Sequence, residues 1–427
     1  MPALTLPPST APRIIYLSQL FDPEPTFKGH DFVRRLEASG FAVEVVTGFP
    51  NYPGGTVYDG YRIRPLTRET MGATPVTRLA VYPSHDRSAM RRILCYGSFM
   101  VTAFLYLTLR APRSDLVYVY YPSLTAGLAA VAAKLFRRTP VIIDIQDMWP
   151  DSLGSSGMMR NPLLLGLVKT ACNLLYRACD HIVVLSPGFK TLLIARGVPA
   201  NKISVIYNWA EENERPAVDG LPNGFDPADN FRILFAGNMG AAQGLNTVLD
   251  AAALTITAHP GCIYYLMGAG VEREALVARV AARGLTNVRF LPRVNLGDVQ
   301  GFLAAADALL VHLVDDPLYR ITIPSKTQAY FYAGRPVLMG VAGDAGDLVR
   351  AADAGYVFAS TNPADLARKV VALIADSPER RLQFGRNARD FYDEHLRREI
   401  GIGAIADLVN RFRRGGQQQT KATGDIF

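Results

Sequence analysis

Ser325 and Lys326 lie in a segment whose predicted structure could bind an anion. Residues 309–313 form a short apolar run typical of a strand, a polar turn leads to Pro324, and Gly334 ends the pattern that follows. This order predicts strand, loop, helix and strand, with Pro324 in the first turn and the Ser325 hydroxyl capping the helix. In a parallel sheet the positive end of such a helix points at the ligand crevice, and Lys326 adds a full charge.

Two glycine-rich turns in the same half of the chain could hold a diphosphate. GNMGAAQG at 237–244 follows the apolar run 233–236, GAG at 268–270 follows the run 263–267, and each opens a helical pattern. A dinucleotide fingerprint requires G-x-G-x-x-G, and Arg273 replaces its last glycine, which disfavours an NAD site. A nucleotide diphosphate held mainly by backbone N–H groups remains open.

The candidate donor-binding residues lie on these turns, on the PRVN sequence after the apolar run 288–291, and around Lys326. Gly29 joins them because it falls between a strand at 14–17 and a helical pattern at 31–39, and glycine lets the backbone approach a ligand closely. A glycine required only for the turn is the other interpretation of Gly29. The complete set is Gly29, Gly237, Asn238, Gly240, Gln243, Gly268, Arg293, Val294, Ser325, Thr327 and Gln328, beside Lys326 as a catalytic cation.

Asp147 is the second catalytic candidate. The sequence IIDIQDMWPDS places it just past the β-rich run 141–145, at the edge where an open α/β sheet keeps its ligand residues. Its carboxylate could contact the transferred sugar or the acceptor, or it could cap or brace the loop. Asp315 and Asp316 are adjacent rather than spaced as D-x-D, so they predict a turn. No metal and no cofactor are inferred.

Composition limits the class of protein. The 427 residues are too many for one ordinary domain, and 49% hydrophobic residues supply ample core. The four cysteines form no C-x-x-C pair, so neither a zinc ribbon nor a disulfide framework is indicated. The net charge of +7 comes without a nucleic-acid-binding motif, which favours a phosphorylated substrate or an anionic membrane over nucleic acid.

The patterns predict two α/β domains with parallel sheets. Residues 1–209 form the first, the acidic, Pro/Gly-rich stretch 210–230 reads as a linker, and strand and helix patterns restart in 231–385. Terminal helices are expected over 386–413, interrupted near Gly401 and Gly403, and the polar residues 414–427 predict a disordered tail.

Residues 93–109 are uncharged and flanked by Arg91, Arg92, Arg110 and Arg113. A helix of this length spans about 25 Å, short of a roughly 30 Å hydrocarbon core, so it is not expected to cross a membrane. It is either a buried helix under a sheet or a helix lying in a bilayer surface with arginines at the headgroups. The start of the chain lacks the regions of a signal peptide, which predicts a cytoplasmic protein peripherally associated with the inner membrane.

In DIQDMWPDS, GNMGAAQG and PSKT together, the chain resembles family-four retaining glycosyltransferases over essentially its whole length. It is most similar to the branch that assembles bacterial O-antigen, colanic acid and exopolysaccharide, including L-fucosamine-transferase-like enzymes. The resemblance implies the GT-B fold, in which two Rossmann-like domains face each other across a cleft. It also implies retention of configuration, a donor nucleotide on the C-terminal domain, an acceptor on the N-terminal one, and a terminal helix that crosses back.

The chain departs from that family at the donor site. Aligned on the PSK helix, a common Glu-x7-Glu pair is replaced by Ile321 and Ala329, and basic residues that commonly grip the diphosphate fall near Asn238 and Gln243, which are uncharged. The diphosphate would then be held by Lys326, helix N-termini and loop N–H groups, which leaves donor affinity and activity open.

The expected function is therefore transfer of a sugar from a nucleotide-diphosphate donor, UDP-linked, to a polyprenyl-diphosphate-linked glycan. Two alternatives stay open at this point. Non-hydrolysing UDP-sugar epimerases share the architecture but need no lipid acceptor, and a non-catalytic, membrane-associated assembly partner would explain the missing glutamates.

Overall fold

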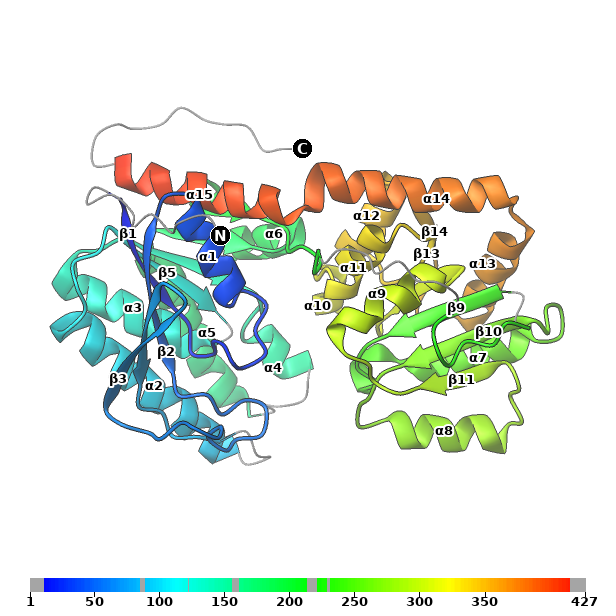
Figure 1. Ribbon diagram of the computed structural model, residues 1–427, viewed down its shortest axis with the longest axis horizontal. Coiled ribbons are helices and arrows are strands. Elements are labelled where there is room, and N and C mark those ends of the chain that lie inside the picture. The colour runs from blue at the N-terminus through cyan, green and yellow to red at the C-terminus, as the bar shows by residue number, and fades with distance from the viewer. Residues whose placement is uncertain are drawn as a thin grey trace. The chain divides into compact units, whose positions relative to one another are not determined.

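The computed structural model describes residues 11–84, 89–121, 123–155, 161–212, 221–228 and 231–414. The chain forms two compact units (Figure 1). Unit 1 comprises Met1–Leu185, Lys190–Ile206 and Ile402–Phe427, and unit 2 comprises Ser186–Phe189 and Tyr207–Gly401. The predicted tail lies outside the described residues from residue 415 onward, as do residues 213–220 and 229–230 of the predicted linker.

Unit 1 is built on an eight-stranded sheet in the order β3-β4-β2-β1-β5-β6-β7-β8. Neighbouring strands are parallel except for β3, which pairs antiparallel with β4 at the edge. The central strands are mainly apolar and buried, as expected for parallel strands covered on both faces, and Asp144 on β6 and His181 on β7 are buried with them. The strands are β1 (Arg13–Leu17), β2 (Ala42–Gly48), β3 (Leu66–Met71), β4 (Thr74–Leu79), β5 (Leu116–Tyr121), β6 (Val141–Ile145), β7 (His181–Val184) and β8 (Ile203–Val205).

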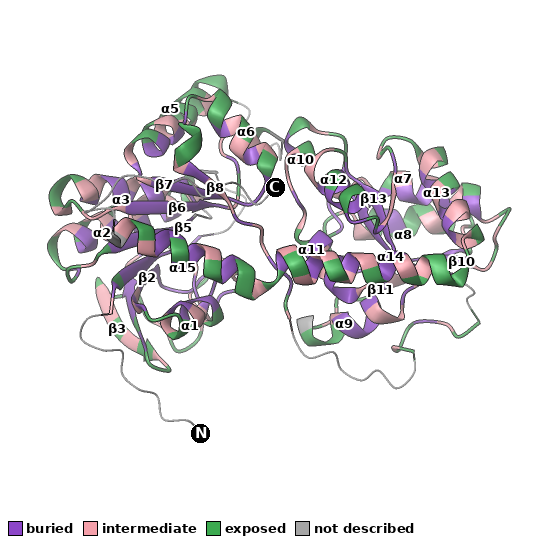
Figure 2. Cartoon of the chain, turned by 90° about the horizontal axis from the view of Figure 1, so that it is seen from above, coloured by how far each residue is buried: buried purple, intermediate pink, exposed green. Residues whose placement is uncertain are grey.

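Helices cover both faces of this sheet. Figures 1 and 2 show α2, α3 and α5 on one face and α1 with α15 on the other. Asn161 caps α5, since its side chain accepts from the N–H groups of Leu163 and Leu164, and Pro162 occupies the first turn. The helices are α1 (His30–Ala38), α2 (Ala89–Leu109), α3 (Leu124–Arg137), α4 (Asp151–Ser155), α5 (Pro162–Ala178), α6 (Pro187–Ala195) and the short η1 (Ala200–Lys202).

Unit 2 has a six-stranded parallel sheet in the order β11-β10-β9-β12-β13-β14. This is the doubly wound order of a dinucleotide-binding domain, with its topological switch point between β9 and β12. The strands are β9 (Phe231–Ala236), β10 (Cys262–Met267), β11 (Val288–Leu291), β12 (Ala308–His312), β13 (Val337–Gly340) and β14 (Gly355–Val357). Buried side chains of β9, β10 and β12 pack on α7 and α13 to form one continuous core.

The helices of unit 2 follow the strands in the βα alternation predicted from the sequence. They are η2 (Ala241–Gln243), α7 (Leu245–Thr255), α8 (Arg273–Ala282), α9 (Leu296–Ala305), α10 (Pro317–Arg320), α11 (Ser325–Ala333), α12 (Asp344–Ala351), α13 (Pro363–Ala375), α14 (Pro378–Phe391) and the π-helical η3 (Tyr392–Leu396). The last helix, α15 (Arg398–Arg414), begins in unit 2 and continues in unit 1. Residues 386–401, grouped with the returning helices in the sequence analysis, belong to unit 2, and residues from Ile402 onward belong to unit 1.

The predicted interruption of the last helix is wrong. α15 runs through Gly401 and Gly403, and the break lies at the π-helical turn Tyr392–Leu396. Gly401 is required for packing instead of for a break, because a Cβ there would stand 2.6 Å from the indole ring of Trp209. Here close contact, and not backbone flexibility, explains the glycine.

Two other elements differ from the sequence-based expectation. The hairpin β3–β4 had no predicted counterpart, because β3 is a half-exposed edge strand with a polar sequence, LTRETM, and so lacks an apolar run. Part of the predicted linker packs into unit 2: Phe225 is buried, with its ring centroid 4.5 Å from that of Tyr265.

A buried ion pair fixes the loops at the carboxyl end of the unit 1 sheet. Lys28, in the loop after β1, pairs with Asp144 on β6, and both side chains are essentially excluded from solvent. Tyr118 donates to Asp144 at 2.6 Å, and the Gln146 amide donates to its other oxygen at 2.6 Å. Because every partner is supplied within unit 1, the buried charge on Lys28 is compensated by a carboxylate with further hydrogen bonds.

We predict that Asp144→Ala destabilises the protein by about 3–5 kcal/mol, because Lys28 would stay buried without a counter-charge. Urea unfolding followed by fluorescence would measure the loss. Asp31→Ala is the matched control, since it removes the exposed 2.8 Å pair with Arg35 and should cost about 1 kcal/mol or less. Equal destabilisation by the two variants would contradict this account.

Candidate functional site

The carboxyl ends of β9 and β12 lie side by side at the switch point of unit 2. In open α/β sheets this is where ligands bind. The turn at Gly237 follows β9, the turn at Gly268 follows the neighbouring strand β10, and the loop leading to α11 follows β12. The structure therefore brings the glycine turns and the Lys326 helix, which are far apart in sequence, to one edge of one sheet.

The two glycine turns pack backbone against backbone. A Cβ on Gly268 would stand 2.0 Å from the carbonyl oxygen of Gly237, and one on Gly270 would stand 2.3 Å from that of Met239. The turns are joined by hydrogen bonds from Gly237 N to Met267 O (2.9 Å) and from Met239 N to Ala269 O (2.8 Å). Only glycine permits this approach, so these residues bring the turn after β9 against the turn after β10.

The turn after β9 is closed by the side chain of Gln243. Its Oε1 accepts from the N–H of Gly240 at 3.0 Å and from the Asn238 amide at 3.5 Å. Together with the inter-turn bonds, this occupies the N–H groups of Gly237, Met239 and Gly240 within unit 2. The glycines therefore contribute close approach, and the positive charge for an anion comes from elsewhere.

Lys326 supplies that charge. Its Nζ is buried and has no hydrogen-bond partner in the described part of the chain. It lies 3.6 Å from the centroid of the Phe235 ring, and a Cβ on Gly237 would be 3.0 Å from it, so the amine opens directly onto the first glycine turn. Burial lowers the pKa of Lys326 from its ordinary value to about 7. An unpaired, desolvated amine of this kind is stabilised by any anion placed beside it.

Helix α11 begins at Ser325 next to this amine. The expectation that the Ser325 hydroxyl caps the helix is wrong: Pro324 is the N-cap, and no side chain of the described residues caps the first turn. A proline N-cap has no hydroxyl to offer, which leaves the first N–H groups of α11 without a capping side chain. Gly334 ends the helix in the left-handed conformation, as predicted.

The other residues of the PSK helix turn inward. Thr327 and Gln328 are buried, and with its nitrogen facing the first turn the Gln328 amide donates to Pro324 O (3.0 Å) and Ser325 O (3.2 Å). Gln328 thus closes its own helix start. Arg293 is exposed and Val294 half-buried, both in the loop after β11.

Sequence reasoning missed His312, the last residue of β12. Its ring is buried, with Nδ1 2.7 Å from the carbonyl oxygen of Gln243 and Nε2 3.1 Å from that of Ser360. The ring therefore lies between the glycine turn after β9 and the segment beyond β14. The signal was present as a lone polar residue closing the apolar run ALLVH.

The two candidates in unit 1 have different surroundings. A Cβ on Gly29 would stand 2.2 Å from Asp22 Oδ2, the atom that accepts from the N–H of His30 at 2.7 Å, so Gly29 makes room for the cap of α1. Asp147 follows β6 and is exposed, and partial desolvation by the surrounding protein raises the pKa of its carboxyl group. Asp147 thus remains the candidate of unit 1 for contacting a substrate.

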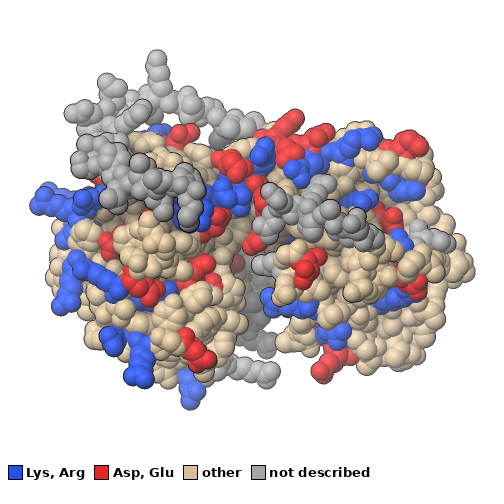
Figure 3. Space-filling model, viewed as in Figure 1, with Lys and Arg blue, Asp and Glu red and all other residues tan. Residues whose placement is uncertain are grey.

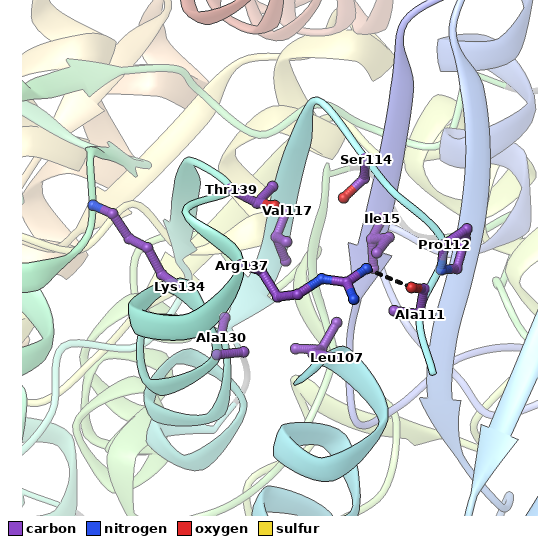
Figure 4. Close-up of a pocket in the computed structure, with 11 residues that line it drawn as sticks. Ile15, Leu107, Ala111, Pro112, Ser114, Val117, Ala130, Lys134, Arg137 and Thr139 are labelled. Carbon is purple, nitrogen blue, oxygen red and sulfur yellow. Dashed lines mark hydrogen bonds between the residues drawn. The ribbon is translucent and has the colours of Figure 1, made fainter. Parts of the chain in front are cut away.

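A small cavity in unit 1 lies at the amino ends of the parallel strands, opposite the end of the sheet that carries Asp147. Figure 4 shows it between the ends of α2 and α3, where Arg137 donates to Ala111 O at 2.6 Å. At about 10 Å³ it holds roughly one water molecule. The amino ends of parallel strands are not where such sheets bind substrates, so this cavity is structural.

Comparison with known proteins gives the family. Residues 30–209 match the family described as Glycosyl transferase 4-like domain, and residues 223–391 match Glycosyl transferases group 1. The chain is 30% identical over 314 residues to WcaI of Escherichia coli (strain K12), whose name assigns it to colanic acid biosynthesis as a glycosyl transferase. That alignment covers 70% of this chain and 76% of WcaI.

Solved structures share the fold at low identity. HepE of Anabaena in complex with UDP is 18% identical with a TM-score of 0.64, covering 93% of this chain and 99% of that one. Sucrose-phosphate synthase of Thermosynechococcus elongatus is 17% identical with a TM-score of 0.72, covering 95% and 100%. The predicted fold and family are confirmed: the chain has two Rossmann-like α/β domains of the GT-B fold, and it belongs to the group 1 glycosyl transferases with a glycosyl transferase 4-like N-terminal domain.

Proposed function

We propose that this protein transfers a sugar from a nucleotide-diphosphate donor, UDP-linked, to a polyprenyl-diphosphate-linked glycan during synthesis of a bacterial surface polysaccharide. The observation that carries the proposal is the buried, unpaired Lys326 amine facing the glycine turn at the switch point of unit 2. Structural charges in protein interiors are paired, as Lys28 is in unit 1. A buried amine without a partner at the ligand-binding edge of the sheet is best explained by an anionic ligand that pairs with it.

The donor class follows from the chemistry of this edge. A diphosphate offers oxygens to the Lys326 amine and to the uncapped first turn of α11. Fixed positive groups aimed at the leaving diphosphate stabilise the charge that develops as the glycosidic bond breaks. Because the amine and helix supply this charge, the proposed reaction is metal-independent, and the family resemblance adds retention of configuration. HepE, of similar fold, has crystal structures in complex with UDP and with UDP-glucose.

The acceptor class is supported by an apolar outer surface on unit 1. We call it the outer apolar surface and define it by these exposed side chains: Met90, Ile93, Leu94, Val101, Leu105 and Leu109 of α2, Leu135 and Phe136 of α3, and Leu163, Leu164, Leu167 and Leu174 of α5. Exposed residues of α2 and α5 are green in Figure 2. Scattered apolar residues are normal on a soluble protein, whereas a set on three adjoining helices indicates an interaction surface.

α2 itself is long and apolar enough to cross a membrane by length and composition, over Met90–Leu109. This segment is longer than the uncharged run 93–109 noted in the sequence. However, Cys95, Phe99, Ala103 and Tyr106 are buried in unit 1, where α2 packs on α3. One stripe of α2 therefore belongs to the protein core and the opposite stripe is exposed, which suits a helix lying in a bilayer surface.

Basic residues flank the outer apolar surface. Arg91, Arg110, Arg113, Arg138 and Lys169 are exposed around it. Figure 3 shows Lys and Arg side chains on the same side of unit 1, where Figure 1 places α2 and α3. Each basic group near an anionic leaflet contributes on the order of 1 kcal/mol. We infer that unit 1 associates peripherally with the inner membrane, where a polyprenyl-linked acceptor resides.

The role of Lys326 predicts that Lys326→Met weakens UDP binding about 10- to 150-fold, since a charge-assisted hydrogen bond contributes roughly 1.5–3 kcal/mol. Methionine keeps the apolar stem against Phe235, and the melting temperature should not fall because a desolvated amine is removed. Isothermal titration calorimetry measures the affinity. Lys169→Met, at an exposed lysine of α5, is the control that should bind UDP normally; unchanged affinity in Lys326→Met would refute the assignment.

The role of Asp147 predicts a different kinetic signature. Asp147→Asn should lower transfer to the acceptor by about 10- to 150-fold while leaving the Kd for UDP unchanged, because the carboxylate belongs to unit 1 and the nucleotide to unit 2. In the wild type, transfer should decline as pH falls through the raised pKa of this carboxyl group, which needs its charge. A parallel loss of UDP affinity, or a pH profile that the substitution leaves intact, argues for a bracing role.

The outer apolar surface predicts binding to lipid. The triple variant Leu94→Gln, Val101→Gln, Leu105→Gln should no longer cosediment with vesicles of phosphatidylglycerol and phosphatidylcholine, because its exposed α2 stripe loses apolar area worth about 25 cal/mol per Å². Wild-type binding should weaken as salt rises. Leu382→Gln, at an exposed leucine of α14 in unit 2, is the matched control. Retention of vesicle binding by the triple variant would dismiss this surface.

A further inference from the structure

His312 is held between two atoms that only accept hydrogen bonds. Both ring nitrogens lie within hydrogen-bond distance of backbone carbonyl oxygens, those of Gln243 at 2.7 Å and Ser360 at 3.1 Å. A neutral imidazole has one N–H, so one of the two contacts must then set a ring lone pair against a carbonyl oxygen. An imidazolium donates to both. The two carbonyl oxygens around the ring therefore favour the charged form.

Burial and a neighbouring positive charge disfavour the imidazolium form of His312 when no anion is bound. Burial and the neighbouring Lys326 amine together lower the pKa of His312, against the two carbonyl oxygens, which raise it. The other groups packed on the ring in the described structure are uncharged: Phe358 stacks on it with centroids 5.9 Å apart, and Gly244 and Gly340 lie at its edges. Lys326 in turn faces Phe235 and the Gly237 turn. Tyr330 of the same helix is uncharged, because burial raises the pKa of its hydroxyl, which accepts from Ala236 N at 3.0 Å.

An anion at the glycine turn changes this balance. It attracts both the Lys326 ammonium and the His312 imidazolium, and it offsets the repulsion between them. We propose that His312 is a positioning residue that becomes doubly protonated when a diphosphate binds, so that its second N–H locks the turn after β9 to Ser360, and that ligand binding is therefore coupled to proton uptake by His312 and Lys326. This inference rests on the proposed diphosphate site.

The direction of the pH dependence follows from linkage. Binding raises both pKa values, so the complex holds more protons than the free protein at pH values between the free-state and the bound-state pKa of each group. For Lys326 that window opens above about pH 7, and for His312 it opens below the ordinary histidine value. The Kd for the diphosphate should therefore rise with pH, by up to about tenfold per pH unit for each proton involved. Below both free-state values the dependence vanishes.

The test is calorimetric titration of the full chain with UDP at about pH 7 and about pH 8, in two buffers of different ionisation enthalpy. The ligand's terminal phosphate, with a pKa near 6, is mostly ionised at both pH values. Wild type should take up protons on binding. His312→Asn keeps a donor that can reach Gln243 O but has no titratable ring, and it should take up fewer protons, by up to about one per site. Lys169→Met should match the wild type.

A measurement on the wild type guards against a variant that fails to fold. The chain has six histidines, so ring proton–carbon spectra recorded over a pH series can follow each one. One buried ring should gain a higher pKa when UDP is added. Proton uptake that is equal in wild type and His312→Asn, or histidine pKa values that UDP leaves unchanged, overturns this inference alone. Absence of binding by UDP, GDP and inorganic pyrophosphate overturns the proposed function and this inference with it.

Discussion

The ligand edge of unit 2 depends on the close approach of two backbones. The turns after β9 and β10 touch at distances that exclude any side chain at Gly268 and Gly270, and their own hydrogen bonds hold them together. This contact fixes where the turn at Gly237 lies, and so fixes the space onto which the Lys326 amine opens. A group that must neutralise a diphosphate gains most when its surroundings are rigid and dry, because nothing then has to reorganise as charge develops.

The two units handle a buried lysine in opposite ways. In unit 1, Lys28 is paired with Asp144, and the tyrosine and glutamine around that carboxylate complete its hydrogen bonds, so the charge serves to hold loops in place. In unit 2, Lys326 has an aromatic face and a glycine turn beside it and no carboxylate among the described residues. In the first case the protein offsets the cost of burial, and in the second, under the proposed function, a bound anion does so. On that proposal the same residue type is structural in one domain and functional in the other.

In the proposed function the outer apolar surface gives unit 1 a different role, which is contact with a membrane. α2 buries one stripe in the core and exposes another, and α3 and α5 extend the exposed area beside basic residues. A lipid-linked acceptor is delivered at a membrane, whereas a nucleotide sugar is taken from water. The proposed division of these roles assigns Asp147 of unit 1 to the acceptor and Lys326 of unit 2 to the donor.

The sequence by itself determined the fold class and the family, and it singled out Lys326 as a candidate, because apolar runs, glycine turns and the PSK triplet are local signals that survive without coordinates. It also identified Gly237 and Gly268, but for a ligand contact, whereas in the structure Gly268 makes room for the backbone of the neighbouring turn and Gly237 faces the Lys326 amine. Only the tertiary structure decided that Ser325 does not cap α11, that Gln328 turns onto its own helix, and that Gly401 packs on Trp209. His312 and Asp144 were hidden for the same physical reason: their roles come from partners 48 to 116 residues away in sequence, brought together only when the parallel strands align.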